Sequence, residues 1–170
     1  MWKMDYESAA DYWVEKDKES VQMEEDELKH RIEEFITGHN TCALATATAD
    51  MVRNTPIEYN YLDGDFYFFS EGGLKFMGLR ENRNVGIAIF EPYEGFSNIK
   101  GLQAQGVAEI IEPFSDEYLK VLEYKHISAE AIKKIPHPMN LIKVVVKNYD
   151  YLDSDLKKEG FGCRQHLCVS

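Results

Sequence analysis

Apolar residues recur at helical spacing in two separate stretches near the start of the chain. Residues 5–18 and residues 24–37 each carry an apolar stripe with the spacing i, i+3, i+4 and i+7. This period is typical of amphipathic α-helices, so the sequence predicts two helices before the first strand. We interpret both stripes as packing faces. Tyr6, Tyr12 and Trp13 in the first helix are of a type enriched at interfaces, so this helix packs either on a partner subunit or on its own domain.

The pattern changes to that of β-strands after residue 40. Residues 66–69 are apolar at every position, which predicts a strand that is buried on both faces. Asp63 and Gly64 precede it and form a hairpin signal, because glycine tolerates the positive φ of a tight turn. Within residues 102–111, small or apolar side chains alternate with polar ones, which predicts a strand. Residues 141–146 are predicted to form a final strand. Strands therefore dominate the middle of the chain.

The order of strands and helices predicts the fold class. Ser115 and Ser128 begin two later helices, because serine is a preferred N-cap residue. Short strands with hairpin-like links and helices at the ends predict a mainly β protein, a closed or nearly closed barrel with flanking helices. The chain has 170 residues, of which 44% are hydrophobic, enough for one good core. We expect one domain, with a helical extension at 1–38, a barrel at 39–150 and a tail at 151–170.

The charge of the chain is uneven. The net charge is -11, and residues 1–34 alone hold twelve acidic and five basic residues. The remainder is close to neutral, with basic residues at Arg53, Lys75, Arg80 and Arg83. Affinity for nucleic acid depends largely on neutralising phosphates with lysine and arginine. We therefore expect no nucleic-acid partner, whereas a small anion in a local basic pocket fits this distribution.

The sequence also argues against a membrane partner and against a bound metal. No apolar stretch approaches the roughly 18–20 residues of a membrane span, and the N-terminal residues lack the apolar region of a signal peptide. We therefore expect a cytoplasmic protein with no membrane partner. The three cysteines, Cys42, Cys163 and Cys168, make no disulfide framework. With His166 the last two give three soft ligands without the fourth that structural zinc requires, so we expect no metal site.

A candidate anion site lies where the aromatic strand ends. Ser70 closes the strand, Gly72 and Gly73 form a turn, and residues 74–82 are predicted to form a short helix with Leu79 and either Phe76 or Met77 facing inward. Lys75 then lies in the first turn of this helix, whose free N–H groups favour a phosphate. The alternative is a solvated lysine in a common strand-turn-helix connection.

The preceding strand strengthens the anion hypothesis. Pro56 cannot donate to a sheet ladder, so residues 52–59 form an edge strand or a bulged one. We expect the backbone groups at Thr55 and Ile57 to be free for a ligand. Arg53 lies on the face opposite Asn54 and Pro56 and can supply a second positive contact to a phosphate. The alternative is an exposed strand arginine.

Residues 42–90 as a whole resemble the pyridoxamine 5'-phosphate oxidase-like family, the FMN-binding split β-barrels. The matching pieces are Thr46, residues 53–57, Phe69 with Ser70, Lys75, and residues 82–85. The resemblance covers roughly residues 38–112 and continues more weakly to about 150. It implies a split β-barrel that binds two FMN per homodimer at the subunit interface.

The resemblance also implies which residues bind the cofactor. Lys75, Ser70 and Arg53 would hold the FMN phosphate, and the segment that follows Arg53 would run along the isoalloxazine ring. The full set implied for the cofactor is Arg53, Asn54, Thr55, Pro56, Ile57, Phe69, Ser70 and Lys75. The oxidases carry a glutamine where Gly101 stands here, and an Arg-Leu-His-like motif where this chain has GFGCRQHLCVS. We therefore do not expect pyridoxamine phosphate to be the substrate.

The leading functional hypothesis is an FMN-dependent oxidoreductase that acts on a small-molecule substrate at a homodimer interface. No catalytic side chain can be named, because the flavin carries the chemistry. Three alternatives stay open: a nitroimidazole-reductase-like protein, a haem-binding or haem-degrading split barrel that uses His166, and a flavin binder without catalysis.

Overall fold

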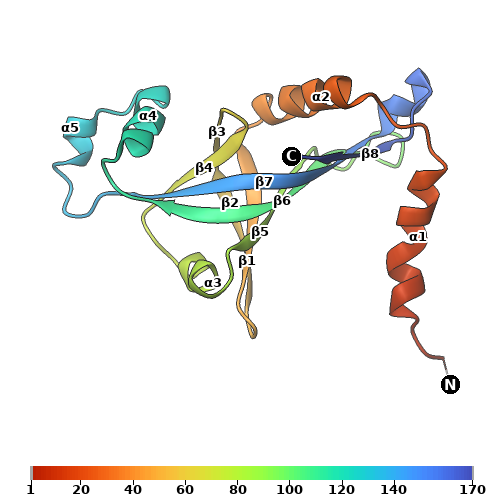
Figure 1. Ribbon diagram of the computed structural model, residues 1–170, viewed down its shortest axis with the longest axis horizontal. Coiled ribbons are helices and arrows are strands. Elements are labelled where there is room, and N and C mark those ends of the chain that lie inside the picture. Colours follow the sequence, from red (N-terminus) through yellow and green to blue (C-terminus); the bar gives the residue numbers. More distant parts are fainter. Residues whose placement is uncertain (1, 170) are drawn as a thin grey trace.

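A curled antiparallel sheet with helices along its rim and at its ends forms the fold (Figure 1). The computed structural model describes residues 2–169. Within this range the sheet has eight strands in the order β2-β1-β5-β6-β7-β4-β3, and β8 pairs with β7. The strands are β1 Thr41–Ala47, β2 Val52–Glu58, β3 Asn60–Leu62, β4 Asp65–Ser70, β5 Asn84–Phe90, β6 Lys100–Ile111, β7 Asn140–Asp153 and β8 Arg164–Cys168. The predicted mainly β architecture with flanking helices is confirmed.

Five α-helices and one 3-10 helix accompany the sheet in the described residues. They are α1 Tyr6–Lys18, α2 Glu25–Thr37, α3 Lys75–Glu81, α4 Asp116–Tyr124, α5 Ala129–Ile132 and the 3-10 helix η1 Ser154–Glu159. The two predicted N-cap serines are confirmed: the hydroxyl of Ser115 accepts from the N–H of Tyr118 at 3.3 Å, and Ser128 accepts from Ala131 at 3.4 Å. None of the helices among residues 2–169 is long and apolar enough to cross a membrane.

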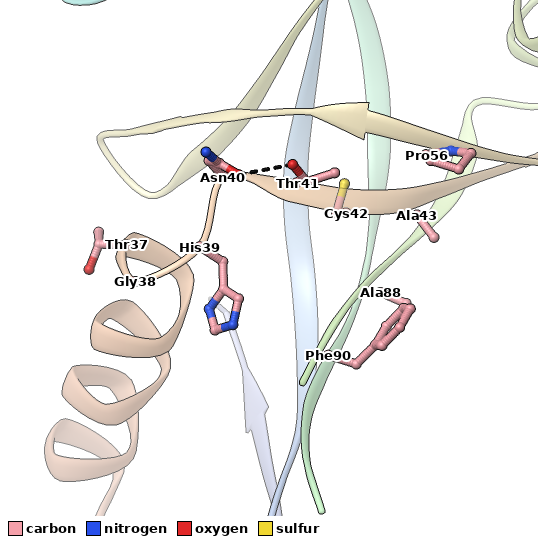
Figure 2. Close-up of a pocket in the computed structure, with 10 residues that line it drawn as sticks. All are labelled: Thr37, Gly38, His39, Asn40, Thr41, Cys42, Ala43, Pro56, Ala88 and Phe90. Atoms are coloured by element: carbon pink, nitrogen blue, oxygen red, sulfur yellow. Dashed lines mark hydrogen bonds between the residues drawn. The ribbon is translucent and has the colours of Figure 1, made fainter. Parts of the chain in front are cut away.

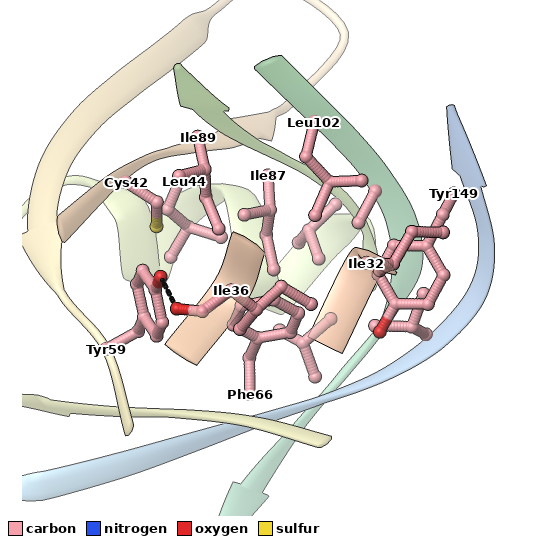
Figure 3. Packing of buried hydrophobic residues seen from close by; sticks show 14 of the residues in the cluster. Ile32, Ile36, Cys42, Leu44, Tyr59, Phe66, Ile87, Ile89, Leu102 and Tyr149 are labelled. Atoms are coloured by element: carbon pink, nitrogen blue, oxygen red, sulfur yellow. Dashed lines mark hydrogen bonds between the residues drawn. The ribbon is translucent and has the colours of Figure 1, made fainter. Parts of the chain in front are cut away.

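Helix α2 fills the concave side of the sheet. Leu28, Ile32 and Ile36 recur at intervals of four and are fully buried, as the apolar stripe of this helix predicts. Figure 3 shows Ile32 and Ile36 packed among strand residues such as Phe66. The hydroxyl of Tyr59 donates to the carbonyl of Ile36 at 2.6 Å and so satisfies one of the free carbonyls at the end of the helix.

Helix α1 forms as predicted but does not bury its apolar stripe. None of its residues is buried, and Tyr6, Tyr12 and Trp13 are all exposed. The helix extends from one end of the sheet, far from α4 and α5 at the other end (Figure 1). The stripe as a whole is therefore not packed on its own domain, although Arg164 lies 5.1 Å from the ring centroid of Trp13.

Two further segments differ in detail from the sequence-based prediction. Helix α3 begins at Lys75 rather than at residue 74; it buries Gly78 and Leu79 and leaves Met77 exposed. The last predicted strand, 141–146, is the first half of β7, which continues to Asp153 because its later residues pair with β6 on one side and β8 on the other.

Gly106 is required by close backbone approach between β6 and β7. The register shifts between Gln105 and Gly106, and a methyl group on Gly106 would lie 2.5 Å from the carbonyl oxygen of Val145 and 2.7 Å from a methyl group of Val144. We expect Gly106→Ala to lower the free energy of unfolding by about 1–3 kcal/mol, the usual range for overpacking. Equilibrium urea denaturation measures this change.

Gly72→Ala is the matched control, because nothing lies within 4 Å of a methyl group at Gly72. Both substitutions restrict the unfolded chain equally, so their difference reports the folded state. Equal urea midpoints for the two variants would refute the close-approach argument.

Candidate functional site

Strand β2 is an edge strand of the sheet, as Pro56 predicts, and its register shows which backbone groups are free. The N–H of Tyr59 donates to Asn40, and that of Thr48 donates to Met51. Every second pair of an antiparallel ladder is hydrogen-bonded. Between the two bonds just named, the hydrogen-bonded pairs are therefore Cys42 with Ile57, Leu44 with Thr55 and Thr46 with Arg53.

The free groups therefore differ from those expected from the sequence. Thr55 and Ile57 turn their backbone groups toward β1, so the expectation that they are free is wrong. The open edge belongs to Asn54 and Pro56 instead. The missing N–H of Pro56 falls where the ladder needs no donor, which explains why proline fits here without a bulge.

The side chains of β2 point alternately to the inner and the outer face of the sheet. Ile57 is partly buried against the core, and Arg53 lies on the same face, directly opposite Thr46 of β1. Helix α3 lies on this part of the hairpin, because a methyl group on Gly78 would be 3.0 Å from both Cβ and Oγ1 of Thr46. The absence of a side chain at Gly78 lets α3 approach β1 closely. Lys75, one turn earlier in α3, is thereby held next to Arg53.

Ser70 and Lys75 meet at the carbonyl of Gly72. Lys75 is only 7% exposed, and its Nζ donates to the Gly72 carbonyl at 2.5 Å. The hydroxyl of Ser70 donates to the same carbonyl at 3.1 Å and also lies 3.3 Å from the N–H of Gly72. Gly73 has a φ of +111°, so the turn that brings Lys75 back over Ser70 favours glycine.

Within residues 2–169, no carboxylate forms an ion pair with either cation of the site. Burial lowers the pKa of Lys75, and the positive charge of Arg53 lowers it further. Neither side chain makes an ion pair with the residues that the structure describes, 2–169. A buried cation is costly unless it is paired, so this arrangement favours an anion from outside the chain.

Thr46 is a site residue that the sequence analysis did not count among the cofactor ligands. Its Oγ1 is buried and, within residues 2–169, has no hydrogen-bond partner. Buried hydroxyls are normally satisfied. Its position opposite Arg53 could have been found only from the pairing of the two strands, which depends on the length of the turn between them.

The predicted cofactor residues thus fall into groups. Arg53, Ser70 and Lys75 come together, and the side chains of Thr55 and Ile57 point toward the interior beside them. Asn54 and Pro56 are exposed on the outer face. The side chain of Phe69 lies on the other face of β4, where its ring centroid is 5.6 Å from that of Tyr118, so only its backbone is available to the site.

A groove follows the outer face of the same hairpin (Figure 2). Its volume is about 600 Å³, and its walls include Ala43, Pro56, Ala88 and Phe90. His39 lies at one end of the groove, where its Nδ1 is 2.7 Å from the Phe35 carbonyl and its Nε2 is 3.0 Å from Glu91. The groove crosses β1, from Pro56 of β2 to Ala88 and Phe90 of β5, and polar residues at the end of α2 close it at one end.

Residues 28–153 match the sequence profile of the pyridoxamine 5'-phosphate oxidase family. The chain belongs to this family. A comparison with curated proteins gives no significant match. The family assignment agrees with the resemblance noted in the sequence.

Solved structures show the same split-barrel fold at low sequence identity. The heme storage protein HutZ from Vibrio cholerae has a TM-score of 0.58 and 18% identity, over 71% of this chain and 90% of that protein. A putative pyridoxamine 5'-phosphate oxidase from Listeria innocua has a TM-score of 0.57 and 20% identity, over 74% and 98%. A FAD-binding protein from Mesorhizobium loti has a TM-score of 0.56 and 20% identity, over 71% and 89%.

The lowered pKa of Lys75 leads to a prediction about the ligand-free protein. We expect Lys75→Met to raise the free energy of unfolding by about 0.5–1 kcal/mol at neutral pH, because it removes a desolvated cation beside Arg53. The charged lysine lowers the free energy of unfolding by its full amount when the pH is below the folded-state pKa of Lys75. This destabilisation disappears as the pH rises past that pKa to the ordinary lysine value of 10.5, so the gain from the variant shrinks at high pH.

Arg80→Met is the control on the same helix. Arg80 is exposed and pairs with Glu81, so its removal should change the free energy of unfolding by less than about 0.5 kcal/mol. Urea denaturation between pH 7 and pH 10 measures both variants. A destabilised Lys75→Met would contradict the view that Lys75 is a desolvated cation without a carboxylate partner among residues 2–169.

Proposed function

We propose that this protein binds FMN and that Arg53, Ser70 and Lys75 hold its phosphate. The observation that carries the proposal is the buried amine of Lys75, which lies beside a second cation and has no carboxylate partner among residues 2–169. A phosphate dianion would supply the missing charge and accept hydrogen bonds from the amine, the guanidinium and the Ser70 hydroxyl. Family membership is the second support, since the resemblance implies FMN as the cofactor.

The open edge of β2 suits the flavin ring. The outward backbone groups of Asn54 and Pro56 lie next to the phosphate site on the same strand, and backbone donors and acceptors of this kind can pair with the polar edge of an isoalloxazine. The neighbouring groove offers apolar surface for the ring face. When bound, FMN would supply electron or hydride transfer, while the chain would bind it and position it against a small-molecule substrate.

We further propose that the protein is a homodimer, with the flavin sites at the interface. Val52 and Phe90 are 77% and 67% exposed on strands β2 and β5, on either side of the small residues of β1. Phe90 also lines the groove, and exposed apolar side chains of this kind are typical of an interaction surface. A partner on this face would also close the flavin site to water.

Haem is the alternative ligand, and the geometry supports it less. Both ring nitrogens of His166 are occupied: Nδ1 is 2.6 Å from Asp150 and Nε2 is 3.1 Å from Asp17. His39 is similarly engaged by Phe35 and Glu91. A haem iron would therefore have to displace an existing contact of either histidine, whereas the cations of the phosphate site make no ion pair among residues 2–169.

We expect Lys75→Ala to weaken FMN binding by about 10–100-fold and to leave riboflavin binding almost unchanged, because the lost contacts are charge-assisted bonds to phosphate. Quenching of flavin fluorescence measures both affinities. Arg80→Ala removes a cation from the exposed side of the same helix and should alter neither. Equal losses for FMN and riboflavin would exclude Lys75 as a phosphate ligand.

The cofactor itself is tested by visible spectroscopy during gel filtration. We expect added FMN to co-elute with a dimer, and NADH or NADPH under anaerobic conditions to bleach its absorbance if the protein is an oxidoreductase. A flavin that stays oxidised with these donors would favour a binder without catalysis. A Soret band on haemin titration that is lost in His166→Ala, without any affinity for FMN, would establish the haem alternative.

A further inference from the structure

Helix α1 has strong end signals in its sequence, although it buries none of its residues. The side chain of Asp5 caps its start by accepting from the N–H of Ser8 at 2.9 Å, and Lys16 and Lys18 lie in its last turn, where cations are favourable. A helix of 13 residues is nevertheless marginal in water, because most helical stability in proteins comes from packing of an apolar face. The stripe of α1 therefore needs a surface that its own domain does not supply.

The C-terminal end of α1 is held on its own domain and sets the direction of the helix. The Oδ2 atom of Asp17 accepts from Nε of Arg164 in β8 at 3.2 Å, and the same guanidinium lies 5.1 Å from the ring centroid of Trp13. Toward its N-terminus the helix leaves the domain and projects past the end of the sheet (Figure 1). The first half of the stripe, residues 6–10, is exposed, with Tyr6 at 78%.

The proposed dimer face of the sheet is small for a stable interface. It is the outer side of β2, β1 and β5, where every second residue points outward: Val52 to Glu58, Thr41 to Ala47 and Asn84 to Phe90. Four residues from each of three strands make twelve, and those at the centre are alanine or glycine. Standard interfaces use roughly 20–30 residues a side. A stable dimer therefore needs further surface from elsewhere in the chain.

Helix α1 lies where this further surface is needed. Phe90, at one end of the dimer face, and Arg164, which holds α1, line the same cavity of about 230 Å³. The helix thus starts beside the Phe90 end of the face and projects beyond it (Figure 1). A partner subunit seated on the face would lie next to the exposed half of the stripe.

The charges of α1 favour a basic surface on that partner. Residues 5–18 carry five acidic and two basic side chains, and Glu7 and Asp11, four positions apart, share one flank of the stripe. At the other end of the dimer face, Arg83 directly precedes β5, is exposed and makes no ion pair among residues 2–169. If the two-fold axis is perpendicular to β5, the Phe90 end of one subunit lies over the Arg83 end of the other.

We propose that α1 packs on the partner subunit of the homodimer. Its apolar stripe, residues 6–13, lies against the partner where β5 begins, and Glu7 and Asp11 face the partner's Arg83. Each subunit contributes one helix and receives one, as the two-fold symmetry of an isologous dimer requires. This inference rests on the homodimer proposed above and is independent of which cofactor the site binds.

A photo-cross-linking residue distinguishes the two sides of α1. Tyr6→p-benzoylphenylalanine places the probe on the stripe, whereas Ser8→p-benzoylphenylalanine places it on the opposite side of the helix, two residues or about 200° away. We expect irradiation of the Tyr6 variant to give a covalent dimer on denaturing gels, with the attachment near Arg83 by mass spectrometry. The Ser8 variant should give almost none.

Charge substitutions test the same contact without a probe. We expect Ala10→Glu to raise the dimer dissociation constant roughly tenfold or more, because it buries a carboxylate against an apolar surface. Ser8→Glu adds the same charge on the opposite side of α1 and should leave the constant unchanged. Arg83→Gln should weaken the dimer by roughly two- to fivefold, whereas Lys134→Gln, exposed near α5 at the far end of the molecule, should not. Sedimentation velocity over a dilution series measures these constants, and circular dichroism checks the helix content.

The proposal is overturned if the Tyr6 and Ser8 probes cross-link equally, or if Ala10→Glu leaves the dimer as tight as Ser8→Glu does. In either case the homodimer stands and only the role of α1 falls. A protein that stays monomeric at every concentration, with and without FMN, overturns the homodimer and the role of α1 together. Flavin binding at Lys75 is measured separately by fluorescence, so its failure is distinguishable from both.

Discussion

Closure of the curled sheet around α2 is the constraint on which the rest of the molecule depends. The inward residues of the strands form one apolar surface, and Leu28, Ile32 and Ile36 cover it at one end. At the other end the cover is the short helix α3, which contacts β1 through Gly78. Since α3 is too short to seal that end with apolar side chains, polar groups reach the interior there. The candidate phosphate site is a consequence of this unequal closure.

The elements that could be predicted are those with local signals. The period of α2, the doubly apolar β4 and the N-cap serines are properties of a few adjacent residues. Strand β8 escaped prediction because its five residues gain their structure from β7, and nothing in Arg164–Cys168 itself requires a strand. The free backbone groups of β2 were assigned to Thr55 and Ile57 rather than to Asn54 and Pro56 for a related reason. Proline excludes one pairing, but only the register decides which side of the strand faces its neighbour.

The residues of the candidate phosphate site also divide into those that local sequence brings together and those that only tertiary packing brings together. Ser70 and Lys75 are five positions apart in one turn, so their meeting follows from local sequence. Arg53 joins them only through the packing of α3 on the hairpin. The strand pattern offered Arg53 as a second phosphate contact without deciding between that and an exposed arginine, and the family resemblance implied the phosphate role. Thr46 is among the residues that carry the resemblance, but neither approach placed it in the site. A buried hydroxyl without a partner is visible only in three dimensions, since threonine in a β-strand is otherwise ordinary.

The basic residues of β8 and those of the candidate phosphate site differ in whether nearby carboxylates pair with them. Arg164 donates to the carboxylate of Asp17, and His166 lies between the carboxylates of Asp17 and Asp150, so the basic side chains at that end of the sheet already have acidic partners. Arg53 and Lys75 receive no carboxylate from residues 2–169, although the chain carries a net charge of -11. The Arg53 and Lys75 site gains the full attraction of an incoming anion, because no carboxylate of residues 2–169 has to be displaced first.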